Sequence, residues 1–588
     1  MYPSFKSNPK LAHAAHTASG IPVLALLLIL SSRSLLHADQ VLSFPESAPV
    51  GFVSVSPQPS YDGPFLVLSN TKSSVQSAQG KVVVPDDCFV KLDLNFDANK
   101  ELSVLSTLPS NAIQSLEIGD AKLTREHMLA ISRVNSLMQL TLKDCQYTVD
   151  AFSEIPPLPN LVSLSCTSFQ KHETPLIEFW IKDLPKLEFL LVSPSLTSRA
   201  LETIQDHKSL VFLNVSVEVD FPKTLLALKN LKSLKGLKLE VPMNGNNDLI
   251  EGIGTLSQLE WIHWFGGKVD TPTLFELSDL PRLNRLDLLL FEAGPGFCAG
   301  IESLKELERL EISTNNELEA IESELVKSLF QLPKLKRWPK IEKVDFETLQ
   351  AICSLDQIES LSFKRMSSVS AKQMKELARL KNLVQLHLEH VDVDDDWLSC
   401  LSEMKQLEYL VLFATQVDGS GFNALTGLRN LKRLWIVNER REIKLEAVAA
   451  LPGLEKLQLS GHFQPPMLVP LRNSRSLKNL RLEGLSGESI DNTTAEWIGE
   501  CPGLSELFLE GNLSDAAAGS IAKLPTIHSL GIRGSTMTRD GILKLASIPT
   551  MQKLSVETTA QIPPDLNKEF RQKFPWMSYL GILKRATR

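Results

Sequence analysis

Residues 383–388 read Leu-Val-Gln-Leu-His-Leu, and residues 407–412 read Leu-Glu-Tyr-Leu-Val-Leu. Both stretches place apolar residues at the first, fourth and sixth positions. This pattern has 21 copies, complete except for Lys340 at the sixth position of the copy at 335. The copies begin at residues 89, 113, 137, 161, 187, 210, 234, 259, 283, 307, 335, 358, 383, 407, 431, 454, 477, 504, 527, 551 and 577. The 20 intervals from 89 to 577 give a mean period of about 24.4 residues. A period held this closely over most of a 588-residue chain predicts one array of small repeated units.

Each period combines a strand pattern with a helix pattern. The alternation inside the motif puts its leucines on one face, as a half-buried strand requires. Helix-like stretches follow the strands at residues 124–131, 370–378 and 514–522. Thr124, Ser514 and Thr538 are suitable N-caps, and Ser370 with Gln373 fits a capping box. A strand and a short helix cannot bury their apolar faces alone, so neighbouring repeats must stack.

Stacking predicts an α/β solenoid that curves. Strands pair about 4.8 Å apart, whereas packed helices need roughly 8–10 Å, so the helical side must be longer. The parallel sheet therefore lies on the concave side and the short helices lie on the convex side. One copy, Leu335-Lys-Arg-Trp338-Pro339, has a proline where a central strand needs an N–H group, so we expect the sheet to be interrupted there.

These motifs resemble those of the leucine-rich repeat family. Thr538-Arg-Asp-Gly541 and Asp418-Gly-Ser-Gly421, each after a motif strand, are similar to the repeats of secreted bacterial leucine-rich repeat proteins of the planctomycete type. The resemblance covers residues 89–582. It implies a scaffold that binds a protein or a glycan on its concave face. A structural component of the cell envelope is the alternative, and a substrate-recognition adaptor or an enzyme fits the sequence less well.

The ends of the chain differ from the array. Residues 1–38 combine a basic start, an apolar run at 21–30 and a small residue at Ala38, which is typical of a secretory signal peptide. The apolar run is too short to span a bilayer, but an uncleaved membrane anchor is the alternative. We expect a β-rich cap over 39–88, the repeat array over 89–558, and a C-terminal capping repeat with its tail over 559–588. The chain is therefore predicted to be exported to the periplasm, the cell surface or the medium.

Charge argues against two classes of partner. The formal net charge is −8, and it becomes −11 if residues 1–38, which carry three positive charges and no negative ones, are removed. Such a chain has no basic surplus for phosphates, so we expect no nucleic-acid partner, and membrane contact only if the N-terminal segment stays uncleaved. The seven cysteines are too scattered for a disulfide scaffold. Free thiols are expected, with a pair between Cys145 and Cys166 on neighbouring repeats as the alternative.

The sequence carries no catalytic motif, so we expect no enzyme activity and no cofactor. P-loops, dinucleotide-binding glycine turns, G-x-S-x-G elbows and H-E-x-x-H pairs do not occur. His387, His390 and Asp392 have side chains that could share a cation. A polar strand end that leads into an acidic helix start explains the same residues, and we predict no metal site.

Large side chains at the outward positions of the motif strands mark the predicted contact surface. Aromatic and arginine side chains at such positions are typical of interface hot spots. One group consists of Phe212, Trp261, His263 and Phe265, and the other of His387, Tyr409, Phe413, Arg433 and Trp435. The alternative is that these rings only pack on each other across the strands.

Overall fold

The computed structural model describes most of the chain from residue 40 to residue 584. The described residues are 40–46, 50–56, 59–62, 65–68, 74–85, 88–94, 102–167, 180–193, 196, 198–216, 221–241, 252–269, 273–290, 292–293, 300–314, 325–342, 344–366, 368–438, 443–461, 465–484, 490–563, 565–574, 577 and 579–584. The predicted signal segment 1–38 lies outside them. The chain forms two compact units, Met1–Cys166 and Thr167–Arg588. The division falls inside the predicted array, and both units are built from the same strand motif.

The first unit joins a β-rich start to four motif strands. Its elements are β1 (Gln40–Ser43), β2 (Phe52–Ser56), β3 (Pro59–Asp62), β4 (Phe65–Leu68), β5 (Ser74–Ser77), β6 (Lys81–Val84), β7 (Phe89–Leu94), η2 (Leu102–Ser106), β8 (Ser115–Gly119), β9 (Lys122–Leu123), α3 (Arg125–Ser132), β10 (Gln139–Lys143), β11 (Gln146–Tyr147) and β12 (Ser163–Cys166). Strands β7, β8, β10 and β12 are parallel, whereas β2 pairs antiparallel with both β7 and β5. Residues 40–84 therefore supply strands ahead of the first repeat, and the boundaries of the predicted cap stay a prediction.

The second unit carries the rest of the repeats. Its first part contains β13 (Phe189–Val192), α5 (Ser198–Ile204), β14 (Phe212–Ser216), α6 (Phe221–Asn230), β15 (Gly236–Val241), η4 (Ile253–Thr255), β16 (Trp261–Gly266), β17 (Lys268–Val269), α7 (Thr273–Ser278), β18 (Arg285–Leu290), β19 (Glu292–Ala293), η5 (Ile301–Ser303) and β20 (Arg309–Thr314). The long strands of this part form a parallel ladder in the order β13, β14, β15, β16, β18 and β20.

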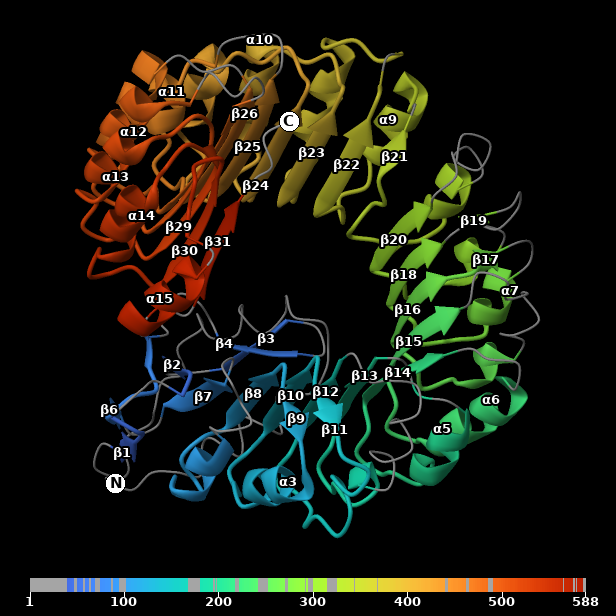
Figure 1. The fold of residues 1–588 in the computed structure, drawn as a ribbon. Helices are drawn as coiled ribbons and strands as arrows, with labels where there is room; N and C mark the ends of the chain where they lie inside the picture. Colours follow the sequence, from blue (N-terminus) through green and yellow to red (C-terminus); the bar gives the residue numbers. More distant parts are fainter. Residues whose placement is uncertain are drawn as a thin grey trace, which may run out of the picture. The chain divides into compact units, whose positions relative to one another are not determined.

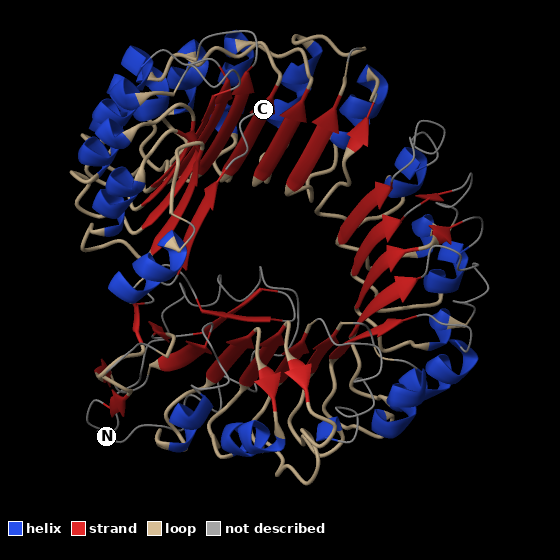
Figure 2. Cartoon of the chain, viewed as in Figure 1, coloured by secondary structure: helices blue, strands red, loops and turns tan. Residues whose placement is uncertain are grey.

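An eleven-stranded parallel sheet follows. Its elements are β21 (Ile341–Glu342), α9 (Phe346–Ile352), β22 (Ser360–Lys364), η6 (Gln373–Arg379), β23 (Gln385–Glu389), α10 (Asp395–Leu398), η7 (Ser399–Glu403), β24 (Tyr409–Phe413), η8 (Ser420–Leu425), β25 (Arg433–Asn438), α11 (Glu446–Ala449), β26 (Lys456–Gly461), η9 (Pro465–Asn473), β27 (Asn479–Gly484), α12 (Asn492–Ile498), β28 (Glu506–Glu510), α13 (Asp515–Ile521), β29 (Ser529–Ser535), α14 (Arg539–Ala546), β30 (Lys553–Thr558), α15 (Leu566–Lys573) and β31 (Tyr579–Lys584). Within this unit the strands form one layer and the short helices another, with the strands on the inner side of its curve (Figure 1, Figure 2).

The predicted repeat is confirmed as an α/β leucine-rich repeat solenoid. From β8 onward, a motif strand begins two residues after the first apolar residue of its motif, as β23 does at Gln385 after Leu383. The motif leucines form the core between strands and helices, and Leu383, Leu386 and Leu388 are at most 1% exposed. Their burial is the main stabilising contribution of each repeat.

The predicted interruption of the sheet is confirmed at residues 335–339. Here Arg337 makes only isolated parallel bridges, to Arg309 on one side and to Ser360 on the other. Trp338 still donates its backbone N–H to Ser360, but Pro339 has no N–H to continue the ladder. The long strands therefore belong to separate sheets that end at β20 and begin at β21.

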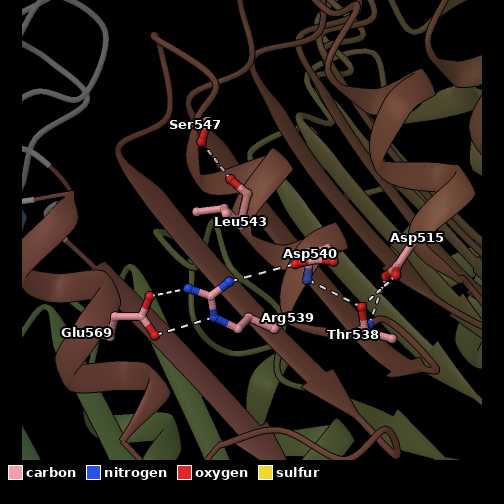
Figure 3. Close-up of polar contacts among 7 residues, drawn as sticks. All are labelled: Asp515, Thr538, Arg539, Asp540, Leu543, Ser547 and Glu569. Atoms are coloured by element: carbon pink, nitrogen blue, oxygen red, sulfur yellow. Dashed lines mark hydrogen bonds and ion pairs between the residues drawn. The ribbon is translucent and has the colours of Figure 1, made fainter.

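Side chains at the helix starts tie neighbouring repeats together. The predicted N-caps Thr124, Ser514 and Thr538 each accept a hydrogen bond from the first turn of their helix. Ser370 and Gln373 form the expected reciprocal bonds, although the segment that follows is the 3₁₀ helix η6. Asp515 also accepts hydrogen bonds from the N–H and the hydroxyl of Thr538 in the next repeat, at 2.8 and 2.6 Å (Figure 3).

The C-terminal helix α15 is held by an ion pair. Arg539, at the start of α14, donates two hydrogen bonds to the Glu569 carboxylate, one of them from Nε at 3.4 Å (Figure 3). Phe570 on α15 is fully buried and packs edge-on against Phe574 at 5.5 Å between ring centroids. Helix α15 and β31 thus complete the last repeat, within the predicted segment 559–588.

Candidate binding surface

The strand face of the second unit is defined by side chains that point away from the helices. On this face, residues in register form columns that run across the strands. The first column contains Phe212, Gly236, Trp261, Arg285, Arg309, Arg337, Ser360, Gln385, Tyr409, Arg433 and Lys456. It includes four of the nine residues predicted from the sequence, and it crosses the interruption of the sheet at Arg337.

Two predicted aromatic residues of this column stack on each other. Phe212 and Trp261 have ring centroids 5.1 Å apart and an interplanar angle of 21°. Gly236 lies between them in the register, and a Cβ atom there would come within 2.8 Å of the Phe212 ring. Phe212 is only 4% exposed, so it serves packing in the free chain, whereas Trp261 is half-buried, and the Arg285 guanidinium covers its ring at 4.3 Å.

Asp287 is the electrostatic centre of this region. It is 3% exposed and accepts hydrogen bonds from Arg285 Nε at 2.8 Å and from Trp261 Nε1 at 3.2 Å. Arg309 Nε lies 3.4 Å from its other oxygen, and His263 Nδ1 lies 3.7 Å away. Burial by itself raises the pKa of Asp287, but His263, Arg285 and Arg309 outweigh burial and lower the pKa to about 2. Asp287 therefore remains ionised and holds the side chains of Trp261, Arg285 and Arg309 in place.

The remaining residues of the first predicted group lie at the rim of this arrangement. His263 is half-buried beside Asp287. Phe265 is 44% exposed, and the Lys238 ammonium lies 5.8 Å from its ring centroid. An exposed aromatic ring beside a cation is a suitable contact for a partner, because burying the ring removes apolar surface from water.

The second predicted group is brought together on β23, β24 and β25. Tyr409 and Arg433 are direct neighbours in the first column, with Tyr409 half-buried and Arg433 exposed. Burial raises the pKa of Tyr409, and the positive charge of Arg433 opposes that change. The phenol is therefore neutral at physiological pH and available as a hydrogen-bond donor.

His387 and Trp435 lie in the next column, on either side of Val411. Val411, which lies between them in the register, is 2% exposed. Burial and the nearby Lys340 lower the pKa of His387. Phe413 is half-buried in the third column and contacts the His390 ring edge-on at 5.7 Å. The second group is thus partly packed and partly open.

Two features of this face were missed in the sequence. Phe508 on β28 is half-buried, and the Arg481 guanidinium covers its ring at 3.9 Å. Gly531 leaves the space for that ring, since a Cβ atom there would come within 2.6 Å of it. Arg337, whose strand is replaced by an isolated bridge, joins the column of Arg285 and Arg309. In the sequence, Gly531 follows Phe508 by about one repeat, and this spacing of a glycine from an aromatic residue could have indicated the covered ring of Phe508.

The cation alternative finds no support in this arrangement. His387 Nε2 lies 4.0 Å from Glu389, while His390 is exposed beyond the strand end. Among the described residues, no group of three histidine, cysteine, aspartate or glutamate side chains could hold a metal ion. The six cysteines that the structure describes, Cys145 and Cys166 among them, have free thiols.

Comparison with known proteins identifies the repeat. Residues 227–466 match a family model described as "Leucine-rich repeat region". TLR13, solved in complex with ssRNA13, is 17% identical over 84% of this chain and 77% of its own, with a TM-score of 0.42. The plant peptide hormone receptor RGFR1, solved with RGF2, is 15% identical over 84% and 81%, with a TM-score of 0.31. A leucine-rich repeat protein of Leptospira interrogans is 16% identical over 80% and 90%, with a TM-score of 0.28.

No helix among the described residues is long and apolar enough to cross a membrane.

Proposed function

Because this chain is a leucine-rich repeat protein, we propose that it is a non-enzymatic binding scaffold that holds a protein partner on the strand face of its second unit. The observation that carries the proposal is the set of partly exposed aromatic and arginine side chains on this face: Trp261 on β16, and Tyr409, Arg433 and Trp435 on the neighbouring strands β24 and β25. Such side chains supply large contact areas at low entropic cost. A glycan is the alternative occupant of the same face.

The architecture supports this proposal through rigidity. Each strand is fixed by its neighbours at about 4.8 Å, so the side chains of a column stand at a regular spacing before any partner arrives. Preorganised contact groups lose little conformational freedom on binding. A partner that spans several strands would engage many of these groups at once.

We also propose that the chain is exported. The basic and apolar composition of residues 1–38 supports this step, and the mature protein would then begin near Asp39. Expression of the full chain followed by mass measurement of the secreted or periplasmic product tests it. A product that retains residues 1–38 would indicate the anchored alternative.

The binding proposal is tested with Tyr409→Ala combined with Trp435→Ala. Cross-linked affinity capture from an envelope fraction should recover a partner with the unchanged chain and lose at least nine-tenths of it with the double variant, because both side chains lie on the proposed contact face. Phe275→Ala is the matched control, since Phe275 on helix α7 is 48% exposed. Capture should be unaffected by the control.

The melting temperature separates contact from packing. We expect the double variant to melt within a few degrees of the unchanged chain, because both side chains are half-buried on the strand face, outside the core between strands and helices. Unchanged capture, or a collapse of the melting temperature that accounts for the loss, would contradict the proposed role of these residues.

A further inference from the structure

Three arginine side chains form a row on the strand face, which we call the arginine row: Arg285, Arg309 and Arg337. They occupy successive places in the first column, through the β18–β20 register and the isolated bridge at Arg337. Their strands are about 4.8 Å apart, so the row spans roughly 10 Å. All three side chains are half-buried, with Arg285 24% and Arg309 31% exposed.

The pairing of the row is incomplete. Asp287 binds Arg285 at 2.8 Å, and Glu311 accepts a hydrogen bond from Arg309 at 2.9 Å. Within the part of the chain that the structure describes, no hydrogen bond or ion pair reaches the Arg337 side chain. The carboxylates of Asp287 and Glu311 therefore pair with Arg285 and Arg309, and the third guanidinium group, that of Arg337, leaves one positive charge in the row unpaired among the described residues.

The environment of Arg337 acts on its charge in both directions. Burial and the adjacent Arg309 and Arg285 lower its pKa, while Glu311 and Asp287 act in the opposite direction. A half-buried guanidinium beside two like charges is costly unless an anion comes to it. The chain places this group at the interruption before Pro339, where backbone pairing is minimal.

We propose that the arginine row binds an extended acidic segment of the protein partner, with carboxylate groups on alternate residues. This inference rests on the proposed function and names the chemistry of one part of its surface. In an extended chain, alternate side chains lie about 6.8 Å apart on the same face, which places successive carboxylates within reach of neighbouring guanidinium groups. Trp261 borders the row, and its ring packs between Phe212, at 5.1 Å between ring centroids, and the Arg285 guanidinium, at 4.3 Å.

The charge of the whole chain favours a short acidic segment over a long polyanion. At −8 overall, the protein repels nucleic acid and anionic membranes at long range. A segment of a few residues experiences mainly the local field of the row, because salt screens charges beyond about 10 Å. The geometry of the row therefore suits an acidic peptide better than a phosphate backbone.

The experiment measures fluorescence anisotropy of a labelled ten-residue peptide of alternating glutamate and threonine, with the full chain in low salt. We expect saturable binding that weakens as salt is raised, and no binding of the matched peptide with glutamine in place of glutamate. Arg337→Gln should raise the Kd at least tenfold, because charge-assisted hydrogen bonds are lost. It should leave the melting temperature unchanged or higher, since Arg337 holds no partner within the described chain.

Arg472→Gln is the matched control, because Arg472 lies on η9 in an exposed pair with Glu500. It should bind the peptide as the unchanged chain does. Absence of binding by the unchanged chain, equal binding of the glutamine peptide, or an unchanged Kd for Arg337→Gln would each overturn the inference. Tighter, Arg337-dependent binding of single-stranded RNA or heparin would replace it with phosphate or sulfate recognition. None of these outcomes affects the capture test with Tyr409 and Trp435, so the two proposals fail separately.

Discussion

Replacement of Asp287 by asparagine tests how the strand face of the second unit is held in place. The change keeps the size of the side chain and removes the charge that pairs with Arg285 at 2.8 Å and with Arg309 at 3.4 Å. A pKa of about 2 against an ordinary value of 3.8 corresponds to about 2 kcal/mol of stabilisation of the folded state. Arg285 and Arg309 also lose their partner, but both keep some contact with water, so this loss adds less. We expect Asp287→Asn to lower the free energy of unfolding by about 2–3 kcal/mol in total.

The dependence on pH gives the sharper readout. Because the folded pKa lies below the unfolded one, the stabilisation is complete above about pH 4 and is lost as the pH falls towards 2. The unchanged chain should therefore lose stability over this window in part through Asp287. Asp287→Asn should be less stable at pH 7 and should show a shallower decline in acid.

Urea unfolding at a series of pH values, with hydrogen exchange of the β16, β18 and β20 amides, measures both effects locally. Glu311→Gln is the control, because Glu311 is 46% exposed and its ion pair with Arg309 should contribute less than about 1 kcal/mol. If Asp287→Asn matched the unchanged chain at pH 7, or declined as steeply in acid, the assigned role of this carboxylate would be wrong.

Two further predictions concern contacts between repeats. Asp515→Ala should lower the free energy of unfolding by about 1–2 kcal/mol and speed hydrogen exchange in α14, because Thr538 loses both of its side-chain-mediated hydrogen bonds to the preceding repeat. Asp540→Ala is the control, because the Asp540 side chain is 86% exposed. Equal exchange in the two variants would count against this role of Asp515. Gly236→Ala should destabilise the chain by about 1–3 kcal/mol and change the near-ultraviolet circular dichroism of Trp261, since the new Cβ would lie 2.8 Å from the Phe212 ring. Gly427→Ala is the control: its Cβ would meet only Lys405 Nζ at 3.6 Å, so it should change neither the stability nor the Trp261 signal. An unperturbed Trp261 signal in Gly236→Ala would show that the stack of Phe212 and Trp261 does not depend on Gly236.

On the strand face, part of the candidate binding surface could be predicted from the sequence. Alternation correctly placed Tyr409, Arg433 and Trp435 on neighbouring strands in the second unit. It could not separate Phe212, which is buried against Trp261, from Phe265, which is exposed, because both occupy outward positions of a motif strand. It gave no signal at Arg285, Asp287 or Phe508, although each takes part in a specific contact.

The sequence by itself determined the repeat, the starts of its strands, the caps at Thr124, Ser514 and Thr538, and the interruption before Pro339. These features depend on local geometry: the period of side-chain exposure, the hydrogen bonds of a first helical turn, and a missing N–H. Only the tertiary structure decided that Asp287 is buried beneath two arginines and that Arg337 completes their row. Residues that meet across the strands are about 24 positions apart in the chain, so their contacts depend on register, neighbouring side-chain size and burial, which no single repeat contains.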